Sequence, residues 1–273
     1  MTAPSAPQFD RQAESLLAFW AEAGVDAMLE DAPVDRIAAG QIAPPRAAPR
    51  AAAPVARTGG PALPDVSEQL KAAQALAAAA PDLEALAAAI AAFDGCPLKF
   101  EGAAHRSVFC RGSATAPLIV IGEGPGAEED VQGLPFVGRA GQLLDRMIAA
   151  AGLSDRVFIT NTVFWRPPGN RTPTPAEQMV CAPFVERAIE LISPKVLLLV
   201  GGASAKAMLK REEGILSLRG RWFEWRSAGG GLEVPALPTL HPAFLLRQPA
   251  AKKRAWSDLL TLAERVDRPD RPT

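Results

Sequence analysis

The stretch LIVIGEGPG, residues 118–126, decides the fold, because a continuously apolar run ends abruptly in a glycine-rich turn. VLLLV at 196–200 is a second apolar run, and both have the composition of strands buried on two faces. Two more strands are predicted at 157–160 and 234–237. Apolar residues recur at helical spacing between and after the strands, at 141–151, 175–192, 203–210 and 252–265. This alternation predicts a three-layer α/β/α fold around a mostly parallel four-stranded sheet.

The chain has 273 residues and a net charge of −1, which excludes a uniformly basic DNA-coating protein but allows a local basic face. It has no apolar run long enough for a membrane span, and its first residues lack the pattern of a signal peptide. Three scattered cysteines indicate reduced thiols rather than a disulfide framework. We therefore expect a cytoplasmic, monomeric protein without a membrane partner.

Composition divides the chain into three parts. Residues 1–37 are predicted to form a helical arm, in which Leu16 and Trp20 share one face. Residues 38–64 contain 16 Ala or Pro among 27 and are predicted to form an extended linker. Residues 65–273 carry the strand and helix pattern and are predicted to be the catalytic domain.

Three loops follow strands of this predicted sheet, at 122–126, 161–171 and 239–242. The carboxyl ends of neighbouring parallel strands meet at one edge, where α/β proteins bind their ligands. The first loop, GEGPG, is ambiguous alone, because glycines after a strand either cradle a phosphate or make a tight turn. It matches neither a Walker loop nor a dinucleotide fingerprint.

Together, three segments resemble the family 4 branch of the uracil-DNA glycosylase superfamily. They are GEGPGAEEDVQGLPFVGRAGQLLD at 122–145, ITNTVFWRPPGNRTPTPAE at 159–177 and LPTLHPAFLLRQP at 237–249. The resemblance covers about residues 93–262. It implies a DNA repair enzyme whose substrate is uracil-containing DNA. Such an enzyme flips uracil out of the helix and hydrolyses its bond to the sugar, leaving an abasic site.

The resemblance and the chemistry of uracil together assign the pocket residues. Phe136 matches the family's stacking residue, and Asn161 can accept from uracil N3–H and donate to O4, which disfavours cytosine. The backbone of the first loop adds further contacts to the base, through Gly122, Gly124, Pro125 and Gly126.

Cleavage leaves negative charge on the departing base, so a donor aimed at uracil O2 lowers the barrier. His241 matches the family's motif histidine and is the predicted donor. Glu123 is the candidate for orienting or activating water, or for stabilising the sugar cation. The best-studied branch of the superfamily places an aspartate one position later in this loop, where Gly124 stands. The motifs contain no lysine nucleophile, so we expect a monofunctional hydrolase.

The segment after His241 is predicted to meet the duplex. Either Leu245 or Leu246 is the expected wedge that fills the gap left by the flipped nucleotide, while the other belongs to the core. The basic residues nearby are either phosphate contacts or a solvated charged face, and the candidates are Arg166, Arg171, Arg247 and Lys252.

The chain departs from the resemblance at one place. Family 4 members usually hold a four-iron cluster on four cysteines, but the corresponding positions here are Phe93, Cys96, Trp165 and Cys181. Two thiols are too few for such a cluster, and Cys110 lies outside the pattern. We expect no cluster and no other metal, with the two aromatic rings filling the volume.

Three alternative functions remain, because each is compatible with part of these motifs. They are a non-catalytic uracil-DNA binding protein, a glycosylase that acts on further deaminated bases, and a nucleotide-binding α/β enzyme. His105 lies outside the motifs and is predicted to be a surface or packing residue.

Overall fold

The computed structural model describes residues 66–268. The predicted arm at 1–37 and the predicted linker at 38–64 lie outside these residues. The described residues all belong to one compact unit, Pro61–Thr273.

A six-stranded sheet with the order β1-β3-β2-β4-β6-β5 forms the middle layer. Its four inner strands are parallel and contain the four predicted segments: β3 (Val157–Asn161), β2 (Leu118–Gly122), β4 (Val196–Val200) and β6 (Glu233–Thr239). Two antiparallel edge strands were not predicted, β1 (Arg111–Gly112) beside β3 and β5 (Phe223–Arg226) beside β6. Four strands was therefore an undercount, although the α/β class and the parallel centre are confirmed.

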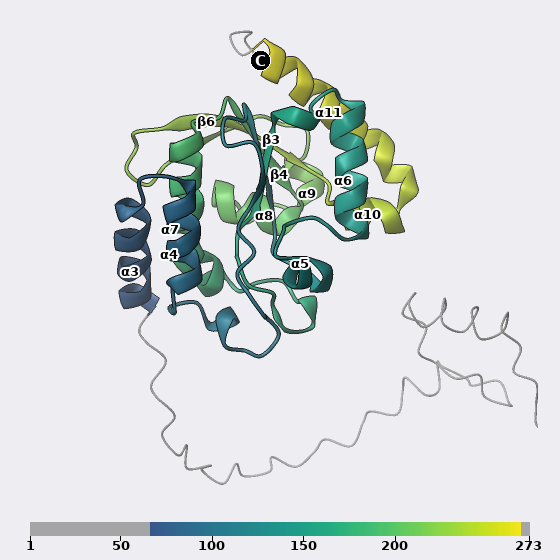
Figure 1. Ribbon diagram of the computed structural model, residues 1–273. Helices are drawn as coiled ribbons and strands as arrows, with labels where there is room; N and C mark the ends of the chain where they lie inside the picture. The colour runs from purple at the N-terminus through teal and green to yellow at the C-terminus, as the bar shows by residue number, and fades with distance from the viewer. Residues whose placement is uncertain (1–65, 269–273) are drawn as a thin grey trace, which may run out of the picture. The chain divides into compact units, whose positions relative to one another are not determined.

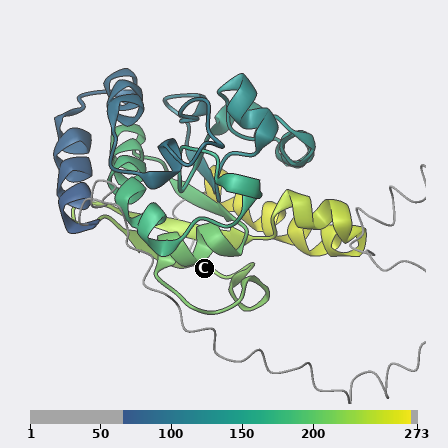
Figure 2. The same cartoon turned by 90° about the horizontal axis from the view of Figure 1, so that it is seen from below.

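Helices cover both faces of this sheet (Figure 1). On one face lie α3 (Val66–Ala79), α4 (Leu83–Ala92), α7 (Pro175–Ile192), α8 (Gly202–Leu209) and α9 (Ile215–Leu218). On the other lie α6 (Arg139–Ala150) and α11 (Lys252–Asp267). The view from below shows the same separation of α3 from α11 by the sheet (Figure 2).

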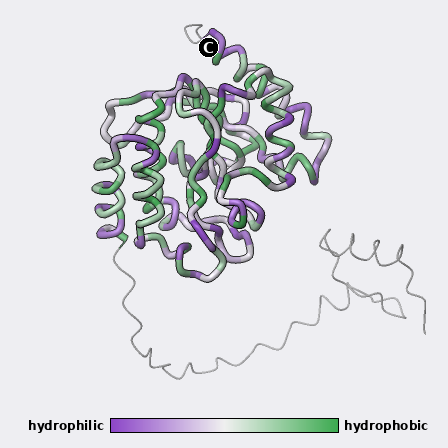
Figure 3. Tube along the Cα trace, viewed as in Figure 1, coloured by the Kyte–Doolittle hydropathy of each residue, from purple (hydrophilic) through white to green (hydrophobic). Residues whose placement is uncertain are grey.

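The alternation of side chains along the strands explains this layering. In β2, Ile119 and Ile121 point into the α7 side, while Leu118 and Val120 point into the α6 side, and all four are fully buried. The strands therefore stand out as the hydrophobic centre of the trace (Figure 3). A sheet held on both faces gives the loops at its carboxyl edge a rigid base.

Short elements shape the loops around that edge. They are α5 (Ala127–Gln132), α10 (Pro242–Arg247) and the 3-10 turns η1 (Pro97–Lys99), η3 (Pro168–Asn170) and η4 (Pro249–Ala251). The 3-10 turn η2 (Ser154–Arg156) lies at the opposite edge, where it leads directly into β3. Within residues 66–268, no helix combines the length and apolar character that crossing a bilayer requires.

Candidate active site

The site is built on the ends of β2 and β3, where Gly122 and Asn161 are register partners. A side chain on Gly122 would not fit, because a Cβ there would lie 2.4 Å from Asn161 Oδ1 and 2.5 Å from the Phe136 ring. Glycine at 122 thus lets the asparagine amide and the aromatic ring approach the same point. The predicted loop convergence is therefore observed for these three residues.

Asn161 is 1% exposed, and neither its Nδ2 nor its Oδ1 has a hydrogen-bond partner within residues 66–268. A buried amide without partners costs about 1–3 kcal/mol, so such groups are rare unless a ligand completes them. The side chain offers one donor and one acceptor side by side. Its complement is a flat ligand edge that presents an acceptor next to a donor.

Phe136 forms a wall of the same space. Its ring stacks on the His241 ring, with centroids 5.9 Å apart and planes at 29°. The backbone of Phe136 is left-handed, with φ of 55°, which is uncommon for a bulky residue. On the loop's far side, Glu129 accepts from the amides of Gly126, Val137 and Gly138, at 3.1, 2.9 and 2.9 Å. One carboxylate thereby ties the GEGPG turn to the loop that carries Phe136.

His241 caps the start of α10, where its Nδ1 accepts from Ala243 N at 3.1 Å. An accepting Nδ1 leaves the proton on Nε2. Burial lowers the pKa of His241 to about 4, helped by the positive charge of Arg247 and opposed by Glu129. The imidazole is thus neutral at physiological pH, and its Nε2–H is the available donor.

A cleft of about 560 Å³ is lined by Phe136, Glu129 and His241, whereas Asn161 and Gly122 are not among its lining residues. Glu123 lines it and is half-buried, and its backbone carbonyl accepts from Thr162 Oγ1 at 2.6 Å. Glu129 was missed by the sequence reasoning, because a glutamate three residues into a helix also reads as a simple capping residue. The predicted residues along the cleft are Glu123, Gly124, Pro125, Gly126, Phe136, Arg171, His241 and Arg247.

Comparison with known proteins decides what this arrangement belongs to. The model of the uracil DNA glycosylase superfamily matches residues 109–260, more than half of the chain. The chain belongs to the uracil DNA glycosylase superfamily.

Curated relatives agree with this assignment. A type-4 uracil-DNA glycosylase of Thermotoga maritima is 41% identical over 138 residues, covering 50% of this chain and 69% of the relative. One from Pyrobaculum aerophilum is 38% identical over 184 residues, covering 65% and 91%. One from Saccharolobus solfataricus is 39% identical over 159 residues, covering 56% and 73%.

The structure separates the two wedge candidates of this glycosylase. Leu245 is fully buried in a small cluster with Leu143, Leu240 and Ala255, which places it in the core. Leu246 is half-buried on the same short helix. Only Leu246 of the pair keeps an accessible surface for DNA.

The basic candidates also differ. Arg247 lines the cleft and is exposed, and Arg166 donates to Asn170 Oδ1 at 2.8 Å. Lys252 is exposed but lines a separate apolar groove of about 300 Å³ beside Trp256. These three positions are compatible with phosphate contacts, although Lys252 does not line the cleft.

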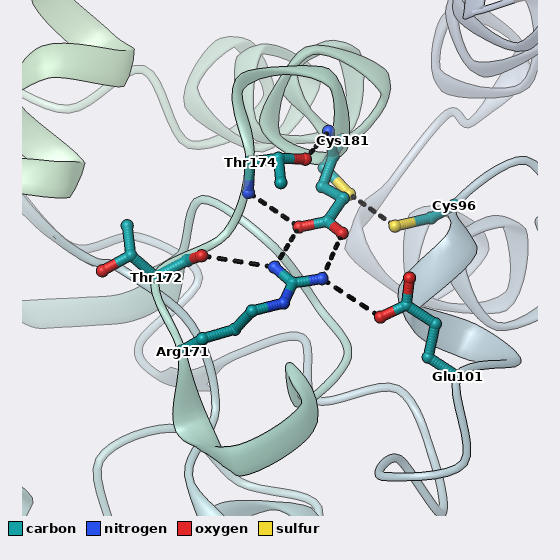
Figure 4. A network of polar contacts seen from close by, with 7 residues as sticks. Cys96, Glu101, Arg171, Thr172, Thr174 and Cys181 are labelled. Atoms are coloured by element: carbon teal, nitrogen blue, oxygen red, sulfur yellow. Dashed lines mark hydrogen bonds and ion pairs between the residues drawn. The ribbon is translucent and has the colours of Figure 1, made fainter. Parts of the chain in front are cut away.

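Arg171 has another role (Figure 4). Its guanidinium donates to both carboxylate oxygens of Glu177, at 2.9 and 2.7 Å, and to Glu101 at 3.1 Å. Glu177 is nearly buried and also accepts from Thr174 N at 2.7 Å, so the fork of Arg171 fixes the start of α7. Arg171 therefore has a structural role at α7, and its phosphate contact stays a prediction.

The four positions of the family's iron–sulfur ligands lie together in the core. Phe93, Cys96, Trp165 and Cys181 are each at most 2% exposed and share one apolar cluster. Cys96 and Cys181 have their sulfurs 3.8 Å apart, and the Phe93 ring packs edge-on against Phe184 at 5.2 Å. Burial and the neighbouring Cys96 thiol raise the pKa of the Cys181 thiol.

This donor set does not fit a four-iron cluster, which needs about four thiolates. Among residues 66–268, no three His, Cys, Asp or Glu side chains are grouped so that they could hold a metal ion. Cys110 is half-buried, and burial raises its pKa to about 11. His105 lies on the surface, where its ring contacts the buried Asp130 carboxylate.

Proposed function

We propose that this protein removes uracil from DNA by hydrolysing the N-glycosidic bond, which leaves an abasic site for base excision repair. The observation that carries the proposal is the buried amide of Asn161 near the Phe136 ring, which has no hydrogen-bond partner within residues 66–268. The type-4 uracil-DNA glycosylases among its relatives support the same substrate. Cytoplasmic location and a monomeric state stay predictions.

Recognition requires an extruded base, because neither the base edge nor the sugar bond is accessible in a stacked duplex. Phe136 stacks on the flipped base. Asn161 Oδ1 accepts from N3–H, and Asn161 Nδ2 donates to O4. Cytosine presents an acceptor at N3 and a donor at C4, so the same amide in this orientation meets the wrong partner twice.

Cleavage of the C1′–N1 bond sends the electron pair to uracil and leaves positive charge on the sugar. His241 donates from Nε2–H to O2 of the departing base, and it does so as a neutral imidazole. The amides of the turn from Gly122 to Gly126 add donors on the same side. Glu123 orients the water that attacks C1′, and its carboxylate stabilises the sugar cation.

The enzyme works without an iron–sulfur cluster. Support comes from the chemistry of the four ligand positions, where two buried aromatic rings stand beside two thiols. Large aromatic side chains bury roughly 150–250 Å² each, enough to replace the packing that a cluster would supply. No catalytic step described above needs a redox group.

The test is excision from oligonucleotides that carry one uracil, followed by alkali, which breaks the strand at abasic sites. Wild-type protein should produce breaks at uracil and none in the matched thymine or cytosine strand. Duplexes with hypoxanthine, xanthine or mismatched thymine measure how far the specificity extends. Binding to uracil-DNA without alkali-sensitive sites would contradict catalysis and favour a binding protein.

A further inference from the structure

Phe136 holds a strained backbone at the point where the base stacks. Its φ of 55° lies in the left-handed region, which a bulky residue occupies only when the surroundings impose it. Helix α6 contributes by close approach, because a Cβ on Gly141 would lie 1.8 Å from the Phe136 carbonyl oxygen. This close packing is compatible with the left-handed conformation, but it does not itself provide a hydrogen-bond donor for the carbonyl groups of Pro135 and Phe136.

Arg111 supplies that partner from the edge strand β1. Its Nε donates to the Pro135 carbonyl at 2.8 Å, and its Nη2 donates to the Phe136 carbonyl at 3.1 Å. The same Nη2 donates to Asp145 on α6 at 2.6 Å. The guanidinium thus binds two consecutive carbonyls and one carboxylate, with 25% of its side chain exposed.

Strand pairing fixes the position of Arg111. β1 pairs with β3, and Arg111 is the register partner of Ile159, two residues before Asn161. Strand β3 therefore positions both groups: it contains Asn161, and it pairs with the edge strand that contains Arg111. A planar fork with donors in fixed directions suits this double contact, whereas a lysine ammonium has no such geometry.

We propose that Arg111 is a positioning residue for base recognition. It holds the Phe136 ring at the distance from Asn161 at which uracil stacks on the ring and forms hydrogen bonds with the amide at the same time. The inference rests on the proposed function. The guanidinium of Arg111 donates to the carbonyls of Pro135 and Phe136 and to Asp145, so it acts through the Phe136 backbone and not by touching the base.

Arg111→Met removes the donors at nearly constant length, and Arg111→Lys keeps the charge without the fork. Both should lower kcat/KM for uracil excision by on the order of tenfold to a hundredfold, because displacement of a positioning group costs rate steeply. Inhibition by free uracil should weaken in parallel, since that binding depends on the ring. The matched control is Arg156→Met, which breaks the exposed Arg156–Asp267 ion pair away from the cleft and should retain wild-type kinetics.

A double-mutant cycle separates positioning from general stability. In a Phe136→Ala background, Arg111→Met should have less than about a twofold further effect, because the ring that it positions is gone. Equal effects in both backgrounds would overturn the proposal, and so would Arg111→Met kinetics equal to those of Arg156→Met. Circular dichroism at the assay temperature verifies that each variant is folded, and Arg111→Lys decides if Arg111→Met is not. Wild-type protein without excision activity would refute the proposed function instead.

Discussion

Asn161 is buried and His241 is half-buried, and each holds its polar side chain at a cost in stability. Within residues 66–268, Asn161 has no hydrogen-bond partner for either of its two side-chain polar atoms, and the pKa of His241 is lowered. Stability given up at a binding site is common, since a preorganised site keeps groups that folding alone would pair. Sequence reasoning found both residues from their motifs, but it could not assign the protonation state, which depends on burial and on Arg247.

The pH dependence of folding tests the state of His241. The pKa of about 4 in the folded protein lies below the ordinary histidine value of 6.5, so the unfolded chain binds the proton more tightly. Stability is therefore lost as the pH falls below about 6.5, and the loss levels off near 4. Between pH 7.5 and 5, wild type should lose about 2 kcal/mol more than His241→Gln in urea unfolding. Equal losses in both proteins would mean that His241 is not buried as a neutral ring.

At the scale of elements, α10 has one face in the core and one toward the cleft. Leu245 packs with Leu240, whereas Leu246 and Arg247 keep accessible surface. The sequence predicted this division but not which leucine belongs to which face, because adjacent residues on a six-residue helix give no clear periodicity. The edge strands β1 and β5 were missed for a related reason: two and four residues are too short for an alternating pattern.

Leucine-to-alanine variants on α10 should divide in the same way. Leu245→Ala should cost about 2–5 kcal/mol of unfolding free energy, as for a fully buried leucine. Leu246→Ala should change stability little and slow excision from duplex more than from single-stranded DNA, since only the duplex needs a wedge. Thermal unfolding and excision rates on both substrates check this. If Leu245→Ala instead slowed excision from duplex DNA while Leu246→Ala lost stability, Leu245 would have to leave the core on DNA binding.

The basic side chains can be sorted by salt dependence. Arg247→Met should reduce the slope of log affinity against log salt on duplex DNA by about one unit, as expected for one lost phosphate contact. Arg171→Met should leave that slope unchanged and lower Tm by several degrees, because it leaves the Glu177 carboxylate without its partner. A reduced slope for Arg171→Met would show that the Arg171 side chain contacts DNA.

At the scale of the whole molecule, the core on the α7 side joins helices and strands with the four positions that correspond to the family's cluster ligands. Phe93 reaches Phe184 of α7, and Trp165 packs on Phe164 at 6.2 Å, which connects the loop after β3 to the same core. The sequence predicted this substitution from the missing cysteines. It could not predict the Arg171–Glu177–Glu101 contacts, since Glu101 is 70 residues from Arg171.

Iron content tests the whole-molecule account. Protein purified without oxygen, from cells supplied with iron and sulfide, should contain no stoichiometric iron and no visible cluster absorbance. Treatment with an iron chelator should leave its excision rate and Tm unchanged. Bound iron, or a loss of stability on chelation, would contradict the packing role assigned to Phe93 and Trp165.

The central claim is that uracil is selected by the amide of Asn161 in this site. Single-turnover excision by wild type and Asn161→Asp, on strands that differ only by uracil or cytosine, measures it most directly. Wild type should release uracil alone, and Asn161→Asp should lose about a hundredfold or more of that rate while remaining folded, because the donor to O4 is gone. Full uracil excision by a folded Asn161→Asp variant would contradict the account.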